Sequence, residues 1–344
     1  MKKLDRYLED QLFYQDLPGL CVSVKKGEEL DYKKALGHRD YINKEELKTN
    51  NIFHCASVTK TVTGTAVMQL VERGNLSLDA KPEDIIKGFK LNDSRQGEIT
   101  VGSMLSHTSG MGDVYDYGWD KPETDKDAMK RYILSDEVRN STMLWAPAEN
   151  RFSYSNMAYE ALGCVVAEVS GMEFEEYVKK NIFEPLHMDN TTLLTFERTD
   201  HDNMAVPHVK NETKHIVREP YYPYNRAHCA SSTMTSDIYD LEKLAQAHIK
   251  GSRGEAPYQL LKKETYKLMW EKRTEVPNNG EGMGLTWFIR EQNGYTLYGH
   301  EGTDDGFRAS FWICPELDMH ITVLSNMTKA PVKKISKGIF DIII

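Results

Sequence analysis

No stretch of this sequence stays apolar for the roughly 18 residues that a membrane-spanning helix needs, which excludes such a helix. The first residues also lack the apolar core of a signal peptide, because charges interrupt them at Asp5, Arg6, Glu9 and Asp10. As written, the chain is therefore expected to be cytoplasmic, unless an export signal has been trimmed from it.

Cysteine is scarce, and its five copies are scattered along the chain. They are odd in number and form no C-x-x-C pair, so neither a disulfide framework nor a zinc site is expected. No H-E-x-x-H pattern occurs among the 11 histidines, and we expect no metal and no other cofactor. Basic residues number 43 against 52 acidic ones, and the net charge of −9 disfavours nucleic acid as a partner.

Internal repeats and low-complexity tracts are absent, and what is present at both ends of the chain is strand-like sequence. Residues 20–26 and 30–40 predict a hairpin that turns at Gly27. Apolar residues at helical spacing predict helices over 3–15 and 332–344. Further strands are predicted at 285–294, 295–302, 307–316 and 319–327.

The middle of the chain, from about 80 to 280, is dominated by helical segments such as 127–138, 156–171 and 174–183. This pattern favours an α+β fold (an α/β sandwich): an antiparallel sheet from both chain termini, flanked by helices, with a mostly helical domain inserted. We therefore predict two domains with an active-site cleft between them. They are residues 1–55 with 281–344, and residues 56–280.

The sequence Ser-Val-Thr-Lys at 57–60 contains a possible nucleophile and its base. A serine hydroxyl is a weak nucleophile unless a nearby group takes its proton. Positions three apart share one face of a helix, and the helix predicted over 58–73 is apolar on most faces, so Lys60 would be buried with a lowered pKa. Ser23 also precedes a lysine by three positions, but in a predicted strand where that lysine cannot face it.

Tyr154 and Asn156 lie where a loop enters a predicted helix. A tyrosine hydroxyl can carry a proton between nucleophile and leaving group, and an asparagine amide can hold a substrate carbonyl. Taken alone, this spacing fits an ordinary capped turn equally well.

His300-Glu301-Gly302 opens a glycine-rich stretch at a predicted strand edge. Gly302 would let a substrate backbone approach the strand, and the next backbone N–H, that of Thr303, would donate to an oxyanion. Alone, this motif also fits a hairpin with a hydrogen-bonded histidine.

In their order, Ser-x-x-Lys, Tyr-x-Asn and His-x-Gly, the three motifs resemble those of the serine β-lactamase and penicillin-binding protein family. The resemblance is to its class C β-lactamase and DD-peptidase-like branch, which includes related esterases and D-aminopeptidases. It runs from about Pro18 to Asn326. Longer stretches that look like hallmarks of this branch are LSHTSGM (105–111), WAPAENRFSYSN (145–156), NIFEPLHM (181–188), MTSDIYDL (234–241) and YGHEGTDDGFRASF (298–311).

The resemblance implies that Ser57 forms an acyl-enzyme, that Lys60 activates it and that Tyr154 relays the proton to the leaving group. Asn156 would position the acyl side chain, and the backbone N–H groups of Ser57 and Thr303 would form the oxyanion hole. The remaining substrate-binding residues would be His300, Glu301 and Gly302. The substrate would be a small-molecule ester, amide, peptide or β-lactam.

Many β-lactamases have Lys-Thr-Gly where this chain has residues 300–302. A carboxylate at Glu301, with Asp304 and Asp305 nearby, is expected to repel the carboxylate of a β-lactam. We therefore favour a serine hydrolase that acts on an ester or amide. Two alternatives stay open: a DD-peptidase (penicillin-binding protein) or β-lactamase, and a non-catalytic binding protein that keeps the pocket.

Two other residues invite a catalytic interpretation. His107 suggests a Ser-His-Asp triad, but no G-x-S-x-G elbow occurs, so we expect His107 to brace its loop through hydrogen bonds. No motif pairs a base with Cys55, two residues before Ser57, so a buried structural role is expected for this cysteine.

Overall fold

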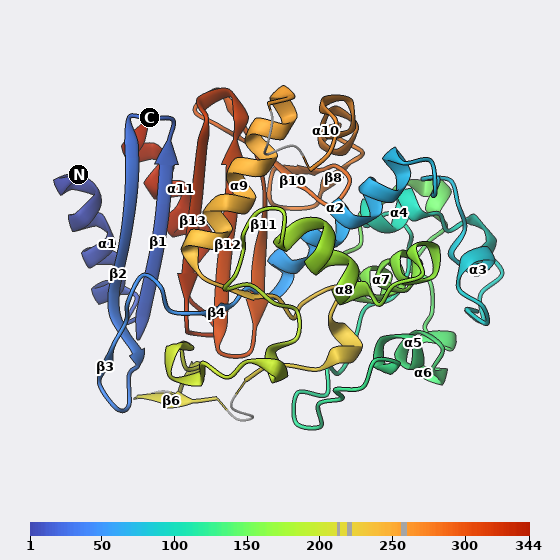
Figure 1. The fold of residues 1–344 in the computed structure, drawn as a ribbon, viewed down its shortest axis with the longest axis horizontal. Coiled ribbons are helices and arrows are strands. Elements are labelled where there is room, and N and C mark those ends of the chain that lie inside the picture. The colour runs from blue at the N-terminus through green and yellow to red at the C-terminus, as the bar shows by residue number, and fades with distance from the viewer. Residues whose placement is uncertain (212–213, 219–221, 256–259) are drawn as a thin grey trace.

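The computed structural model describes residues 1–211, 214–218, 222–255 and 260–344. A large sheet with flanking helices forms one region, and a group of helices forms the other (Figure 1). The strands are β1 (Gly19–Lys26), β2 (Leu30–Asp40), β3 (Glu45–Glu46), β4 (Phe53–His54), β5 (His208–Lys210), β6 (His215–Val217), β7 (Thr235–Ser236), β8 (Thr274–Val276), β9 (Glu281–Met283), β10 (Phe288–Gln292), β11 (Tyr295–Asp304), β12 (Phe307–Cys314) and β13 (Met319–Ser325). The α-helices are α1 (Lys2–Tyr14), α2 (Thr59–Glu72), α3 (Pro82–Ile85), α4 (Val101–Leu105), α5 (Ala128–Ile133), α6 (Asp136–Arg139), α7 (Asn156–Ser170), α8 (Phe174–Val178), α9 (Ile238–Arg253), α10 (Lys263–Trp270) and α11 (Val332–Ile343).

The main sheet is antiparallel and has nine strands in the order β3-β2-β1-β13-β12-β11-β10-β9-β8. Its centre joins the two ends of the chain, because β1 pairs with β13 and places Leu20 opposite Ser325. This topology confirms the α+β fold with a sheet built from both termini.

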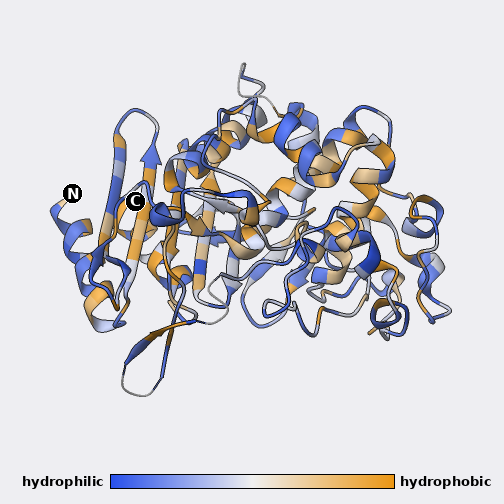
Figure 2. Cartoon of the chain, turned by 60° about the horizontal axis from the view of Figure 1, so that its bottom comes forward, coloured by the Kyte–Doolittle hydropathy of each residue, from blue (hydrophilic) through white to orange (hydrophobic). Residues whose placement is uncertain are grey.

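Both faces of the sheet are covered, which explains why its central strands are apolar on both sides. Along β12, Phe311 and Ile313 join the core shared with α2 and α7, whereas Trp312 and Cys314 join the core beneath α1 and α11. Successive side chains of a strand point to opposite faces, so one strand serves two cores. Hydrophobic residues accordingly gather along the strands and central helices, while the connecting loops are mostly hydrophilic (Figure 2).

Helix α2 is buried along most of its length. Every residue from Thr59 to Leu70 is buried, which confirms the expectation of a deeply buried helix. A buried helix of this kind gives its polar side chains no access to bulk water, so they must find partners inside the protein.

Two details differ from the sequence-based expectations or extend them. The segment 127–138 forms two short helices, α5 and α6, because the Ser135 hydroxyl accepts the Val138 N–H and starts a new helix there. The C-terminal group of strands already begins at Thr274, inside the segment that was assigned to the helical domain. Helix α9, from the same segment, packs on β1, β12 and β13. The two-domain division stays a prediction. Within the described ranges, no helix has both the length and the apolar character that crossing a membrane requires.

Candidate active site

Ser57 lies in a single 3₁₀ turn, Ala56–Val58, that leads directly into α2. Ala56 has a φ of 46°, a left-handed conformation that is uncommon for a residue with a side chain. Lys60 follows in the first turn of α2, three positions after Ser57, and this spacing places the two side chains on the same face. The predicted helix over 58–73 therefore exists, but it begins at Thr59, and Val58 belongs to the tighter turn that precedes it.

Lys60 contacts Ser57 directly. Its Nζ lies within hydrogen-bond distance of Ser57 Oγ at 3.1 Å, and it donates to Asn156 Oδ1 at 2.6 Å and to the Ser231 carbonyl at 3.0 Å. The Lys60 residue is 0% exposed. None of these three groups carries a charge, so an ammonium group here would be buried without a carboxylate in direct contact.

The environment of Lys60 favours its neutral form. Burial lowers the pKa of Lys60 from 10.5 to about 7, although nearby carboxylates, led by Glu160 and followed by Asp113 and Asp304, oppose this shift. A base with a pKa near the working pH is suited to proton transfer. Lys60 can therefore accept the Ser57 proton at neutral pH.

Tyr154 is a neighbour of both Ser57 and Lys60. Burial raises the pKa of Tyr154 well above 10, and a hydrogen bond with Ser57 opposes the shift. Its ring centroid lies 4.9 Å from Lys60 Nζ. The Tyr154 phenol therefore stays protonated at neutral pH, which suits a group that donates a proton to a leaving group.

His107 packs against Tyr154 and holds the backbone that follows it. Its ring stacks on Tyr154 with the centroids 4.3 Å apart, and its Nδ1 accepts the Ser155 N–H at 3.1 Å. Burial lowers the pKa of His107 well below 6.5, so the imidazole is a neutral acceptor. The expected bracing role of His107 is confirmed.

Asn156 is the first residue of α7, whose start is capped by the Ser155 hydroxyl. While its Oδ1 accepts from Lys60, its Nδ2 donates to Asp113 Oδ1 at 2.9 Å. Asp113 also accepts the Asn156 backbone N–H at 2.8 Å. These bonds fix the orientation of the amide and leave its second N–H hydrogen available for a substrate carbonyl.

His300 borders the site from the sheet. The pairing of β11 with β10 ends at Gly299, opposite Phe288, so the following residues form an edge. His300 Nδ1 donates to the Glu301 carbonyl at 2.7 Å, and burial lowers the pKa of His300 to about 3. The imidazole is therefore neutral where many β-lactamases place a lysine. Within the described residues, its buried Nε2 has no hydrogen-bond partner.

Glu301 points to the opposite face of β11. Its Oε1 accepts hydrogen bonds from Trp312 Nε1 at 2.6 Å, Ser310 Oγ at 3.1 Å and Arg290 at 3.3 Å. The carboxylate is thus partly buried and paired with a guanidinium, although burial still raises the pKa of Glu301.

Asp304 and Asp305, the other two carboxylates that were expected to repel an anionic substrate, also have partners. Asp304 lies 3.0 Å from His54 Nε2 and accepts from Trp119 Nε1 at 3.2 Å, and Asp305 pairs with Arg218 at 2.6 Å. Each of the three carboxylates therefore has a hydrogen-bond or ion-pair partner within the protein, and their repulsion of an anionic substrate stays a prediction.

Gly302 serves packing within the protein. A Cβ at this position would lie 2.2 Å from the Cys55 carbonyl oxygen, two residues before the nucleophile. The glycine therefore lets β11 approach the backbone that holds Ser57; the sequence had suggested approach by a substrate instead. Burial also raises the pKa of the Cys55 thiol, which agrees with a structural role.

We expect Gly302→Ala to lower kcat/KM about 100-fold, because the added methyl would push β11 away from Cys55 and displace the Thr303 N–H by a fraction of an ångström or more. Steady-state kinetics and the melting temperature should be measured together. Gly97→Ala is the matched control, since its new methyl would lie 3.7 Å from the nearest atom. Unchanged kinetics for Gly302→Ala would contradict this role.

The predicted residues converge on one cavity of about 390 Å³. Of these, Ser57, Tyr154, Asn156, His300, Glu301 and Thr303 line it. Lys60 lies beneath Ser57, and Gly302 lies against Cys55. Lining residues that the sequence analysis missed are Asp113, Tyr117, Asn279, Glu281, Phe288 and Lys333.

Comparison with known proteins places this arrangement in a family. The chain matches the family described as Beta-lactamase over residues 4–341. Protein flp of Staphylococcus aureus (strain N315) is 26% identical over 340 residues, covering 97% of this chain and 64% of that protein. The chain thus spans less than two thirds of the length of this curated relative.

Two solved structures share the fold. The octameric penicillin-binding protein homologue from Pyrococcus abyssi gives a TM-score of 0.83 at 26% identity, covering 99% of this chain and 77% of that one. D-amino acid amidase from Ochrobactrum anthropi SV3 gives a TM-score of 0.84 at 18% identity, covering 99% of this chain and 98% of that one. The fold, the ordered motifs and the family match lead to one conclusion: this chain belongs to the beta-lactamase family.

Proposed function

We propose that this protein is a serine hydrolase that cleaves an ester or an amide through an acyl-enzyme on Ser57. The observation that carries the proposal is the contact between Lys60 Nζ and Ser57 Oγ at 3.1 Å, with the lysine fully buried. A buried lysine within hydrogen-bond distance of a serine can take the serine proton and thereby activate the hydroxyl as a nucleophile.

The reaction follows from the protonation states of the two groups beside Ser57. Neutral Lys60 takes the Ser57 proton while Oγ attacks the substrate carbonyl carbon, and the carbonyl oxygen becomes an oxyanion. The proposed donors to this oxyanion are the backbone N–H groups of Ser57 and Thr303, both of which line the cavity. As the bond to the leaving group breaks, Tyr154 donates its proton to that group and recovers one from Lys60. Water then attacks the acyl-enzyme by the reverse relay and releases the acid.

The charge of the site supports a substrate without a carboxylate near the scissile bond. The His300 imidazole is neutral, so it offers no cation where a lysine would attract an anion. Lys333, the ammonium that lines the cavity, already pairs with Glu281 at 2.8 Å. An amide substrate also agrees with the shared fold of D-amino acid amidase.

Two alternatives stay open, and one of them has support of its own. Likeness to a penicillin-binding protein homologue favours a DD-peptidase or β-lactamase, which would act on D-peptides or antibiotics. A non-catalytic binding protein would use the same cavity. Against this last possibility stands the complete Ser57, Lys60 and Tyr154 arrangement, which binding alone does not require.

A substrate panel tests the proposal. We expect the wild-type protein to turn over a short-chain nitrophenyl ester or an amino acid amide with a kcat/KM at least about tenfold above that for benzylpenicillin, because the neutral His300 gives the antibiotic carboxylate no counter-charge. Faster turnover of benzylpenicillin would support the β-lactamase alternative. Binding of these compounds without turnover or covalent adduct would support the binding protein.

A further inference from the structure

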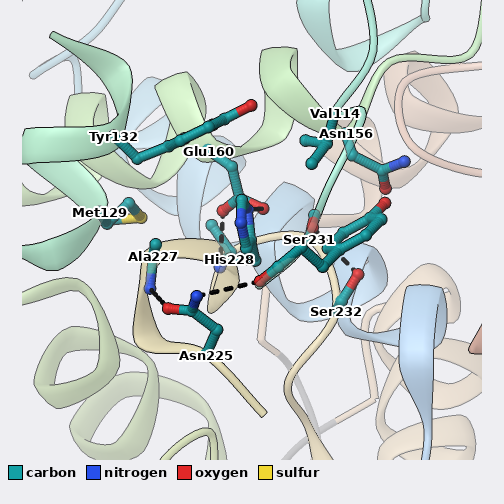
Figure 3. Close-up of polar contacts among 12 residues, drawn as sticks. Val114, Met129, Tyr132, Asn156, Glu160, Asn225, Ala227, His228, Ser231 and Ser232 are labelled. Atoms are coloured by element: carbon teal, nitrogen blue, oxygen red, sulfur yellow. Dashed lines mark hydrogen bonds and ion pairs between the residues drawn. The ribbon is translucent and has the colours of Figure 1, made fainter. Parts of the chain in front are cut away.

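A carboxylate and an imidazole lie buried side by side behind Lys60. Glu160 belongs to α7 and is 0% exposed, and His228 belongs to the 3₁₀ turn Arg226–His228 and is 2% exposed. Glu160 Oε1 lies 3.5 Å from His228 Nδ1. Figure 3 shows the two side chains facing each other, with Tyr132 and Met129 beside them. The proposed reaction assigns no role to either group.

The surroundings of this pair are mostly apolar or aromatic. The His228 ring has edge contacts with the rings of Tyr117 at 5.0 Å, Tyr132 at 4.7 Å and Trp119 at 6.1 Å. In such an environment a charge is screened weakly and acts over a longer distance than at the surface. The nearby Glu175 is already engaged by Arg226 at 2.7 Å.

Hydrogen bonds connect Glu160 to the base. Its Oε2 accepts the Ala230 N–H at 3.2 Å, and the Ala230 carbonyl accepts from Thr63 on α2 at 2.6 Å. The next carbonyl, that of Ser231, is the one that accepts from Lys60 Nζ at 3.0 Å. Glu160 therefore holds the short segment that holds Lys60.

Glu160 is also the deepest negative charge near Lys60. The other carboxylates that act on the lysine are Asp113, which is exposed and bonded to Asn156, and Asp304, which lies against His54. Other titratable groups near Lys60 are Tyr154, which precedes α7, and Tyr159, which lies on α7. The imidazoles of His107 and His300 also act on Lys60.

We propose that Glu160 is a positioning residue for the reaction: it fixes the Ala230–Ser231 backbone against Lys60 and, through its buried charge, sets the pH at which Lys60 becomes a base. His228 closes the far side of the carboxylate and keeps water from it. The inference rests on the proposed function for its catalytic consequence, but the effect on Lys60 itself does not depend on any substrate.

Glu160→Gln separates charge from position, because the amide oxygen can still accept the Ala230 N–H. Loss of the negative charge should lower the midpoint of Lys60 titration by about one pH unit. The titration should be followed by NMR of protein labelled with ¹³C at lysine Cε, with the Lys60 signal assigned from Lys60→Met. The acidic limb of kcat/KM against pH should move down by the same amount.

Glu175→Gln is the matched control, since it removes another buried carboxylate that contacts the same 3₁₀ turn through Arg226. It should leave the Lys60 midpoint unchanged. Glu160→Asp should keep the midpoint close to that of the wild type but lower kcat, because the shorter side chain retains the charge and loses its reach to Ala230. Should Glu160→Gln not fold, Glu160→Met removes the same charge with an unbranched chain and must give the same shift.

An unchanged Lys60 midpoint in the charge-removing variants would overturn the inference. Equal loss of activity at every pH in Glu160→Gln and Glu175→Gln would likewise reduce Glu160 to a structural residue. If the NMR midpoint moves as expected while the wild type hydrolyses nothing, the proposed function fails and the inference about Glu160 stands.

Discussion

Ser57→Ala should lower ester turnover by about 10⁴-fold or more and abolish covalent labelling. The variant keeps the cavity and its other polar groups, but it loses the oxygen that would form the bond to the acyl group. Intact-mass spectrometry over the minutes after substrate addition is the direct measurement. Wild-type protein should gain the mass of the acyl group, and the variant should not.

The chain supplies its own control for this experiment. Ser23 also precedes a lysine by three positions, but it lies in β1 with its Oγ 3.1 Å from His320 Nε2. Ser23→Ala should therefore retain both labelling and turnover. A covalent adduct that persists in Ser57→Ala would show that another residue is the nucleophile. An adduct with benzylpenicillin that forms and stays would favour a penicillin-binding protein.

Lys60→Met should lower kcat by about 10³-fold or more, and Lys60→Arg should be equally inactive because a guanidinium stays protonated. The wild-type rate should rise with pH through a midpoint near 7, where the pKa of Lys60 lies. Below this pH the ammonium form predominates and cannot take the Ser57 proton. Lys26→Met, at the end of β1, removes a partly buried lysine far from Ser57 in the fold and should leave the profile unchanged.

The same lysine also gives a test that needs no substrate. Its pKa is about 7 in the folded protein against 10.5 as the usual value. Between these limits the unfolded chain binds a proton that the folded chain does not, so the free energy of unfolding from this group rises as pH rises across the window. Denaturant unfolding at several pH values should show a flatter dependence in Lys60→Met. Identical slopes would contradict a buried neutral lysine.

Much of the fold could be predicted because its signals are local. The hairpin over 20–26 and 30–40 has its turn at Gly27, and α2 has apolar residues on most faces, as a fully buried helix requires. Ser57, Lys60, Tyr154 and Asn156 were marked by spacing, and the structure brings all four into contact through Lys60.

The rest of the site depends on contacts between distant segments, which spacing does not encode. Nothing in a short pattern shows that Asp113 reaches Asn156 or that Lys333 borders the cavity. Glu301 and its neighbour His300 both line the cavity, but the pleat of β11 turns their side chains to opposite faces, and Glu301 pairs with Arg290. The contacts of Glu301 therefore depend on Arg290 of the neighbouring strand β10, which the sequence pattern does not reveal.

The pairing of β1 with β13 has a consequence for biosynthesis. These neighbours lie far apart in the sequence, since Leu20 pairs with Ser325, so the centre of the sheet cannot form until β13 has been synthesised. Strand β11, which packs against the turn of Ser57, gains its partner β12 equally late. We therefore expect a chain that stops before β12 to lack the complete geometry around Ser57, and to show no turnover of the proposed substrates.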